Sequence, residues 1–162
     1  MTRLPSFVLS LAAGALLLAA CGTSGSSGTA STPAPSPTPA PVVKTATAMV
    51  AGQSMTILVG ASNGMTLYYY TPDKGAGKVT CTGACLTAWP PLLLSGADTN
   101  PTGDKSVTGT LGTIASPNGG MQVTYKGWPL YFWTKDTAPG DTTGQNVGGK
   151  WFVVPPDVPA NS

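Results

Sequence analysis

The sequence predicts an all-β domain of two pseudo-symmetric, hairpin-based repeats that follows a signal peptide and a disordered linker. The segment GMTLYYYTPD at 64–73 returns as GWPLYFWTKD at 127–136, 63 residues further along the chain. Both copies are rich in β-branched and aromatic residues, which favour strands. No stretch of about 12 residues or more shows the apolar spacing of an amphipathic helix. We therefore expect sheets, with a single helical turn near 85–89 that Pro90-Pro91 ends.

The N-terminus has the pattern of a secretory signal. Arg3 precedes an apolar run at 7–20, and Cys21 follows. A basic start and a short apolar run are typical of a signal peptide, whereas a membrane-spanning helix needs about 20 apolar residues. We expect residues 1–20 to be the signal peptide. The sequence LAAC at its end resembles the lipobox of bacterial lipoproteins, which implies cleavage before Cys21 and lipidation of its sulfur. The alternative is ordinary secretion, with Cys21 lost or left free.

A linker follows the signal peptide. Its sequence, GTSGSSGTASTPAPSPTPAP, is rich first in Gly and Ser and then in Pro. Such a composition describes a flexible tether that becomes a stiffer spacer. We expect a disordered linker over 21–44 that holds the domain away from a membrane. The domain is then expected over 45–158, with repeat one at about 55–95 and repeat two at about 119–156.

Each repeat is expected to contain a β-hairpin. In the first, SMTILVGAS forms one strand, SNG at 62–64 the turn, and MTLYYYTPD the returning strand. In the second, MQVTY is one strand, Lys126-Gly127 the turn, and WPLYFWT the returning strand. Neither hairpin is expected to bury its apolar face alone, because an isolated hairpin is marginally stable in water.

The two copies align residue by residue, and the similarity extends beyond them. A tryptophan follows each copy, Trp89 in the first and Trp151 in the second, and a Pro-Pro pair follows each tryptophan. We infer an internal duplication in which two units, each a hairpin and a returning Trp segment, pack by a pseudo-twofold rotation. The aligned pairs are Leu67 with Leu130, Tyr68 with Tyr131, Tyr69 with Phe132, Tyr70 with Trp133, Thr71 with Thr134, and Asp73 with Asp136.

Alternation along a strand assigns these side chains to two faces. Leu67 and Tyr69 are expected on one face, and Tyr68 and Tyr70 on the other, with the same division in repeat two. Large rings on both faces predict that both are covered, so most of these rings are expected in the core. Asp73 and Asp136 end the two copies, where an Asp commonly accepts backbone N–H groups in an Asx-turn. The alternative places them as two acids flanking one site.

Composition excludes several kinds of protein. From Cys21 onward the chain has seven Lys and six Asp, and no Arg, His or Glu. This near-neutral chain lacks the basic footprint of a nucleic-acid-binding protein. Without His it also lacks the usual general base at neutral pH and the commonest metal ligand. We expect no enzymatic activity, no cofactor, no metal site and no nucleic-acid partner.

Two cysteines remain once Cys21 is assigned to the lipid. Disulfides persist in exported proteins, and Gly83 between Cys81 and Cys85 permits a tight turn. We predict a Cys81–Cys85 disulfide that holds one loop. The alternative is a redox-active pair, although the spacing is Cys-x3-Cys and not the Cys-x-x-Cys of thiol oxidoreductases.

The motifs GMTLYYYTPD, CTGACLTAWPPL, MQVTYKGWPLYFWTKD and WFVVPP together resemble the secreted-repeat lipoprotein family of bacterial envelopes. The resemblance runs from about Ile57 to Pro156. It implies an envelope location and a repeated β fold, and it gives no reaction. The family's Yx(F/W/Y)xxD motif maps onto Tyr68, Tyr70 and Asp73, and onto Tyr131, Trp133 and Asp136.

Two hypotheses for function follow. The first is a lipid-anchored envelope protein, on the periplasmic or extracellular face, that serves as a binding or structural module for an envelope polysaccharide or a protein partner. The second is an accessory of an envelope redox system that uses Cys81 and Cys85 or a bound cofactor. The candidate binding aromatics of the first hypothesis are Tyr68, Tyr70, Trp89, Tyr131, Trp133 and Trp151.

Overall fold

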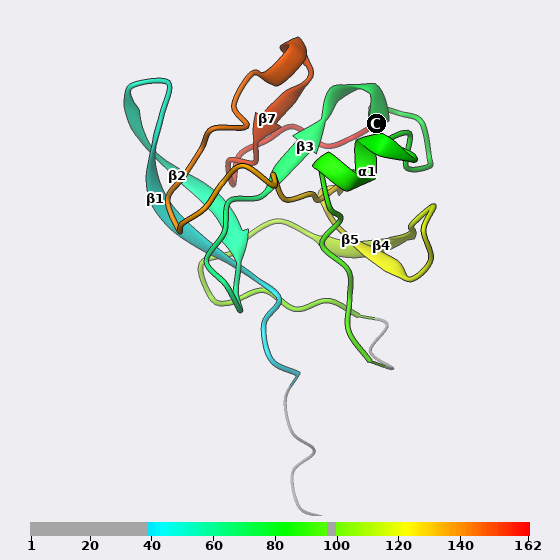
Figure 1. Cartoon of the computed structure of the whole chain (residues 1–162). Helices are drawn as coiled ribbons and strands as arrows, with labels where there is room; N and C mark the ends of the chain where they lie inside the picture. Colours follow the sequence, from blue (N-terminus) through cyan, green and yellow to red (C-terminus); the bar gives the residue numbers. More distant parts are fainter. Residues whose placement is uncertain (1–38, 97–99) are drawn as a thin grey trace, which may run out of the picture. The chain divides into compact units, whose positions relative to one another are not determined.

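The computed structural model describes residues 39–96 and 100–162, which fold as short antiparallel strands with almost no helix (Figure 1). The all-β prediction is confirmed. The expected signal peptide, Cys21 and most of the linker lie outside the described residues. The strands are β1 Val43–Val50, β2 Gln53–Gly60, β3 Tyr68–Tyr70, β4 Leu111–Ala115, β5 Met121–Tyr125, β6 Trp128–Pro129 and β7 Trp151–Val153.

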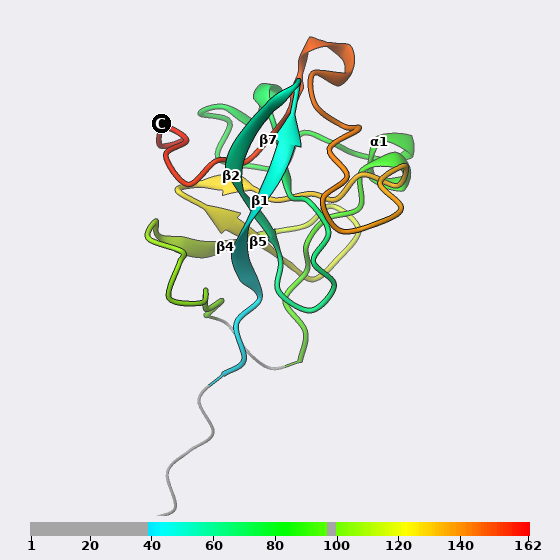
Figure 2. The ribbon, with the colours of Figure 1, turned by 90° about the vertical axis from the view of Figure 1, so that its left-hand side faces the viewer.

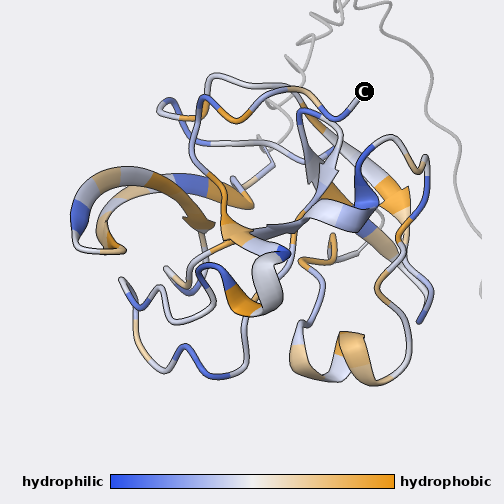
Figure 3. Cartoon of the chain, turned by 90° about the horizontal axis from the view of Figure 1, so that it is seen from above, coloured by the Kyte–Doolittle hydropathy of each residue, from blue (hydrophilic) through white to orange (hydrophobic). Residues whose placement is uncertain are grey.

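Helical structure in residues 39–96 and 100–162 is limited to single turns. The helix α1 spans Ala84–Ala88 and ends before Pro90-Pro91, as the sequence predicts. Its residues are mostly apolar, and Figure 3 shows its ribbon in the colours of hydrophobic residues. Two 3₁₀ turns complete the set: η1 at Thr71–Asp73 and η2 at Val147–Gly149.

The longest hairpin joins β1 and β2, which twist around each other (Figure 2). Their register runs from Val43 opposite Gly60 to Val50 opposite Gln53. Ala51 and Gly52 make the two-residue turn with φ angles of 50° and 84°, the conformation that a tight hairpin needs. This hairpin differs from the expected one, because β2 pairs along its whole length with β1. β1 also begins inside the segment assigned to the linker.

The segment expected to pair with β2 contacts it only at one end. Val59 and Thr66 form an isolated bridge, and the Leu67 N–H donates to the Leu58 carbonyl at 3.0 Å. The turn at 62–64 is present between them, but the chain then leaves β2 to form β3. Turn residues such as Asn and Gly predict where the chain reverses. They do not predict which strand pairs with the segment that follows.

The second repeat contains the three-stranded sheet β4-β5-β6. Lys126 and Gly127 connect β5 to β6 with φ angles of 49° and 84°, so the predicted turn at these residues is confirmed. β4 pairs with the other edge of β5, with Leu111 opposite Tyr125. It was not among the expected strands.

The two repeats meet at Tyr68 and Tyr131. The Tyr68 N–H donates to the Tyr131 carbonyl at 2.8 Å, and the Tyr131 N–H donates to the Tyr68 carbonyl at 3.0 Å. These two residues are the aligned pair of the duplicated motif, so the hydrogen bonds are related by the pseudo-twofold rotation that the sequence predicts.

Each returning Trp segment pairs with the aromatic strand of the other repeat. β7 of repeat two pairs with β3 of repeat one, with Tyr70 opposite Trp151. In the matching position, the Phe132 N–H donates to the Pro90 carbonyl at 2.8 Å. The repeats are therefore intertwined, and each one completes the sheet of the other.

The Pro-Pro pairs are not equivalent, contrary to expectation. Tyr68 lies opposite Val153, and its counterpart Tyr131 lies opposite Pro91. Pro90-Pro91 therefore takes the place of Phe152-Val153, and Pro155-Pro156 comes later in repeat two. Proline lacks a donor N–H, so the Trp89 segment makes bridges where β7 makes a ladder.

The side chains divide into two hydrophobic clusters, which confirms the predicted faces of the aromatic strands. One cluster contains Tyr68, Tyr131, Trp89 and Trp151, with Tyr70 and Trp133 packed against it. The other contains Leu67 and Leu130, with Tyr69 and Phe132 packed against it. Both faces of these strands are covered.

Gly144 of repeat two packs closely against repeat one. A Cβ at this position would lie 2.7 Å from the Tyr68 ring and 2.9 Å from Trp89. We predict that Gly144→Ala lowers the free energy of unfolding by about 1–3 kcal/mol, as overpacking a core does. Gly112→Ala is the control, because the nearest atom to its added Cβ would be the Thr124 hydroxyl at 3.1 Å. Equal midpoints for both variants in urea unfolding would contradict the close approach.

Candidate functional site

Two buried tyrosines bond to carboxylates of the opposite repeat. The Tyr68 hydroxyl donates to Asp136 Oδ2 at 2.6 Å, and the Tyr131 hydroxyl donates to Asp73 Oδ2 at 2.7 Å. All four side chains are buried. We call these the crossed Tyr–Asp pairs. They link the first motif position of each repeat to the last motif position of the other.

The second oxygen of each carboxylate is held by a threonine. Asp73 Oδ1 accepts both the N–H and the hydroxyl of Thr80, at 2.7 Å and 2.5 Å. Asp136 Oδ1 accepts the same two groups of Thr143, at 3.0 Å and 2.7 Å. The aspartates accept backbone N–H groups as predicted, but each donor lies seven residues further along the chain and not within the expected Asx-turn. A buried carboxylate with three donors is satisfied in the way that burial requires.

The crossed pairs keep both phenols protonated. Burial, and then the hydrogen bond to the negative carboxylate of Asp136, raise the pKa of Tyr68 far above its usual value. Burial and Asp73 raise the pKa of Tyr131 in the same way. The ionised phenolate would lose its solvation and face a carboxylate, so the neutral phenol is the form that the fold holds.

Four aromatic rings stack through the centre of the first cluster. The rings of Trp89 and Trp151 are nearly parallel, with centroids 3.9 Å apart. Trp133 stacks on Trp89 at 4.0 Å, and Tyr70 stacks on Trp151 at 4.2 Å. The order Tyr70, Trp151, Trp89, Trp133 is symmetric under the repeat. We call this set the ring stack.

The crossed tyrosines touch the ring stack edge-on. Tyr68 meets Trp89 with centroids 5.4 Å apart, and Tyr131 meets Trp151 at 5.1 Å. Edge-to-face and offset-stacked pairs are the favourable aromatic geometries, each contributing about 0.5–1.5 kcal/mol beyond area burial. The Tyr–Asp pairs and the stack therefore form one continuous unit.

The two ends of the ring stack are more open than its middle. Trp89 and Trp151 are 4% and 5% exposed, whereas Tyr70 and Trp133 are half-buried. Lys135 places its ammonium group 5.5 Å from the centroid of the Trp133 ring, within the range of a cation–π contact.

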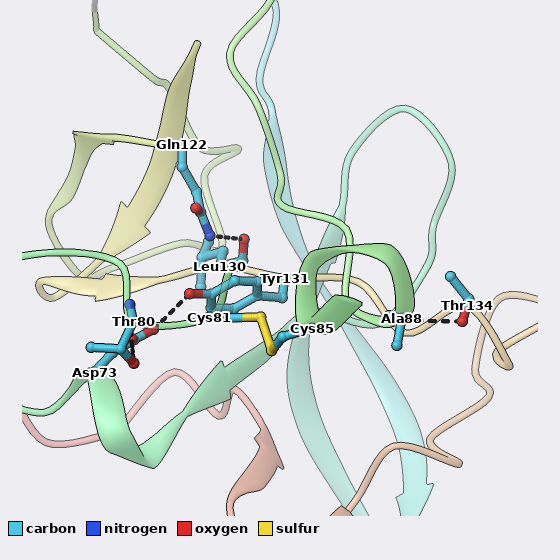
Figure 4. The surroundings of a disulfide bond; sticks show 9 residues. All are labelled: Asp73, Thr80, Cys81, Cys85, Ala88, Gln122, Leu130, Tyr131 and Thr134. Carbon is cyan, nitrogen blue, oxygen red and sulfur yellow. Dashed lines mark hydrogen bonds between the residues drawn. A yellow bond between two sulfur atoms is a disulfide. The ribbon is translucent and has the colours of Figure 1, made fainter. Parts of the chain in front are cut away.

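Cys81 and Cys85 form the predicted disulfide, with their Cα atoms 5.4 Å apart. Figure 4 shows it among Asp73, Thr80 and Tyr131. It joins the end of the Asp73–Thr80 loop to α1 and thereby holds one of the two carboxylate clamps. Its counterparts in repeat two, 63 residues on, are Gly144 and Gly148.

The structure brings the expected motif residues together across the repeats. Among the six candidate binding aromatics, it buries Tyr68, Trp89, Tyr131 and Trp151. Only Tyr70 and Trp133 keep part of their surface in solvent. The idea of two acids flanking one site is replaced by two separate clamps, since each aspartate binds the tyrosine of the other repeat.

Sequence reasoning missed Thr80 and Thr143. The signal was available, because each follows its aspartate by seven residues and the two lie 63 residues apart, as the tyrosines and aspartates do. The duplicated pattern is therefore longer than the Yx(F/W/Y)xxD motif, and a Thr stands seven residues after the Asp.

The fold and these paired sites define a protein made of two copies of one β repeat. The chain belongs to the family described as a secreted repeat of unknown function, whose model matches residues 49–93 and 112–155. The two matches together cover more than half of the 162 residues. No curated protein and no solved structure matches the chain.

Two further properties concern the described part of the chain. Within 39–96 and 100–162, no three or more His, Cys, Asp and Glu side chains gather as metal ligands would. In the same residues, no helix has the length and apolar character needed to cross a membrane.

Removing one phenol hydroxyl tests the crossed pairs. We predict that Tyr68→Phe and Tyr131→Phe each lower the free energy of unfolding by about 1.5–3 kcal/mol, the range for hydrogen bonds to charged groups. Tyr69→Phe is the matched control, since Tyr69 lies on the opposite face of β3. Denaturant unfolding measures all three, and a Tyr68→Phe cost no larger than that of Tyr69→Phe would contradict the assignment.

Alkaline pH is expected to unfold the domain. The pKa of Tyr68 and that of Tyr131 are raised in the folded state, whereas unfolded tyrosine titrates at about 10. Their contribution is fully present below about pH 10, and above it stability falls by about 1.4 kcal/mol per pH unit for each tyrosine. Urea unfolding from pH 9 to 12 measures the slope. In Tyr68→Phe the loss of stability per pH unit should be smaller by the contribution of one tyrosine, about 1.4 kcal/mol. An unchanged slope would contradict the raised pKa of Tyr68.

Proposed function

We propose that the protein is a lipid-anchored, non-enzymatic binding module of the bacterial cell envelope. The secreted-repeat family supports an exported location, and the LAAC sequence before the linker supports a lipid on Cys21. The observation that carries the binding role is the ring stack, which ends in two half-buried aromatic rings on a rigid base.

The rigidity of the base favours binding. Trp133 stacks on Trp89, and the next residue, Thr134, donates its N–H to the Ala88 carbonyl at 3.2 Å. A ring that is already held in place loses little conformational freedom when a ligand covers it, so more of the contact energy remains as affinity. The outer face of Trp133 therefore has the character of a preformed platform.

The chemistry at Trp133 favours an anionic polysaccharide. A sugar ring can lie on the indole face, and the Lys135 ammonium near that face supplies one positive charge. The exposed Thr134 follows Trp133 in the chain, and its hydroxyl oxygen, which donates to the Ala88 carbonyl at 3.1 Å, can accept a hydrogen bond from a ligand. A polymer that carries carboxylates or phosphates between its sugar rings would use all three features.

Binding can be measured by tryptophan fluorescence and calorimetry with a panel of soluble polysaccharides, polygalacturonate being an anionic member and dextran the neutral reference. We predict that an anionic polymer binds and that Trp133→Leu weakens it at least about tenfold, equivalent to 1.4 kcal/mol. Lys135→Gln should weaken the anionic polymers and leave any neutral binding unchanged.

Phe132→Leu is the matched control, since Phe132 is the next ring on the same segment and packs in the other cluster. Its affinity should equal that of the unchanged protein. If no polysaccharide of the panel binds, or if Trp133→Leu and Phe132→Leu lose affinity equally, the proposal of a binding platform at Trp133 is wrong.

The lipid anchor has its own test. We predict that Cys21→Ser abolishes labelling of the protein by radioactive palmitate in a bacterial host and moves it from the membrane fraction to the soluble fraction. Two acyl chains give stable anchoring, which a chain without them lacks. Cys85→Ser should keep the label, because Cys85 lies in the folded domain. Membrane retention of Cys21→Ser would contradict the anchor.

A further inference from the structure

The ring stack and the crossed Tyr–Asp pairs together have the geometry of a path for single-electron oxidation. Four oxidisable rings lie in contact from Tyr70 to Trp133, with successive centroids 4.2, 3.9 and 4.0 Å apart. Electrons pass readily between π systems in van der Waals contact. Both ends of the path are half-buried, so an oxidant reaches the ends before the middle.

We propose that the ring stack carries oxidation from its ends to Tyr68 and Tyr131, so that the domain serves as a sink for one-electron oxidants in the envelope. The co-reactants are outer-sphere oxidants, small radicals above all, that take one electron from an accessible ring. The proposal goes beyond polysaccharide binding and does not depend on it.

In the proposed step, oxidation begins at Trp133 and ends at Tyr68. The oxidant takes one electron from Trp133 and is reduced, and Trp133 recovers an electron from Trp89. Trp89 then takes one electron from Tyr68, whose ring centroid lies 5.4 Å from that of Trp89. As Tyr68 loses the electron, its O–H bond breaks and the proton passes to Asp136 Oδ2, which lies 2.6 Å from the phenolic oxygen. The products are a neutral tyrosyl radical, a neutral carboxylic acid and the reduced oxidant.

Charge decides where the oxidation stops. A tryptophan radical cation in the buried part of the stack would be a charge out of water, which is costly. At a Tyr–Asp pair the positive charge cancels against the carboxylate, because a positioned carboxylate accepts the phenolic proton. The Lys135 ammonium also disfavours a positive charge on Trp133 and drives it inward.

A third buried tyrosine, Tyr125, shows what distinguishes Tyr68 and Tyr131, the two proposed end points of the oxidation, which we call the radical traps. It is fully buried like them, but its hydroxyl donates to the Pro156 carbonyl at 2.8 Å. A backbone carbonyl is a far weaker base than a carboxylate, so oxidation of Tyr125 has no comparable proton acceptor. Tyr125 is also outside the ring stack, which makes Tyr125→Phe a matched control.

The test is pulse radiolysis of the whole protein with the azide radical, which oxidises accessible tryptophan by one electron. Transient absorption and freeze-quench electron paramagnetic resonance follow the radicals. We expect a tryptophanyl signal that decays at the rate at which a tyrosyl signal rises. Both should slow in D2O, because the transferred proton becomes a deuteron.

Tyrosine-to-phenylalanine variants test whether Tyr68 and Tyr131 are the radical traps. In Tyr68→Phe/Tyr131→Phe we expect loss of the tyrosyl signal that rises as the tryptophanyl signal decays, and a longer-lived tryptophanyl radical, while Tyr125→Phe behaves as the unchanged protein. A tyrosyl signal that still rises at the rate of tryptophanyl decay in the double variant, or equal rates in H2O and D2O, would overturn the proposal. If near-ultraviolet circular dichroism shows that the double variant is unfolded, the D2O comparison on the unchanged protein decides alone.

Discussion

The crossed hydrogen bonds between Tyr68 and Asp136 and between Tyr131 and Asp73 are the constraint on which the rest of the structure depends. Each aspartate belongs to the loop of one repeat and each tyrosine to the strand of the other. Neither carboxylate has its full set of donors within its own repeat. A buried charge without partners is strongly destabilising, so the two halves are stable only in each other's presence.

The same exchange builds the hydrophobic interior. β7 completes β3, the Trp89 segment completes the strand of Tyr131, and the four stacked rings come alternately from the two repeats. A small domain of modest core volume gains cooperativity from this arrangement, because each of the two hydrophobic clusters draws residues from both repeats. The half-buried ends of the stack are the surfaces where we propose that a ligand or an oxidant acts.

The sequence predicts much of this from the duplicated motif. Its alternation assigned Leu67 and Tyr68 to opposite faces, and its 63-residue spacing indicated two related units. It did not predict that β2 pairs with β1, because the pairing of neighbouring strands is set by tertiary packing. It also did not show that Asp73 reaches Tyr131 and not Tyr68, since spacing along the chain carries no information on which repeat supplies a partner. The exposure of Trp133 is likewise a property of the assembled stack.

Fragment complementation tests the central claim most directly. Residues 39–96 contain Asp73 and Tyr68, and residues 100–162 contain Asp136 and Tyr131, so each fragment prepared as a separate chain holds one member of each crossed pair and lacks its partner. The account predicts that neither fragment alone gives the near-ultraviolet circular dichroism of stacked tryptophans, and that an equimolar mixture recovers it. Cooperative unfolding of either fragment by itself, with that signal present, would contradict the mutual dependence of the two repeats.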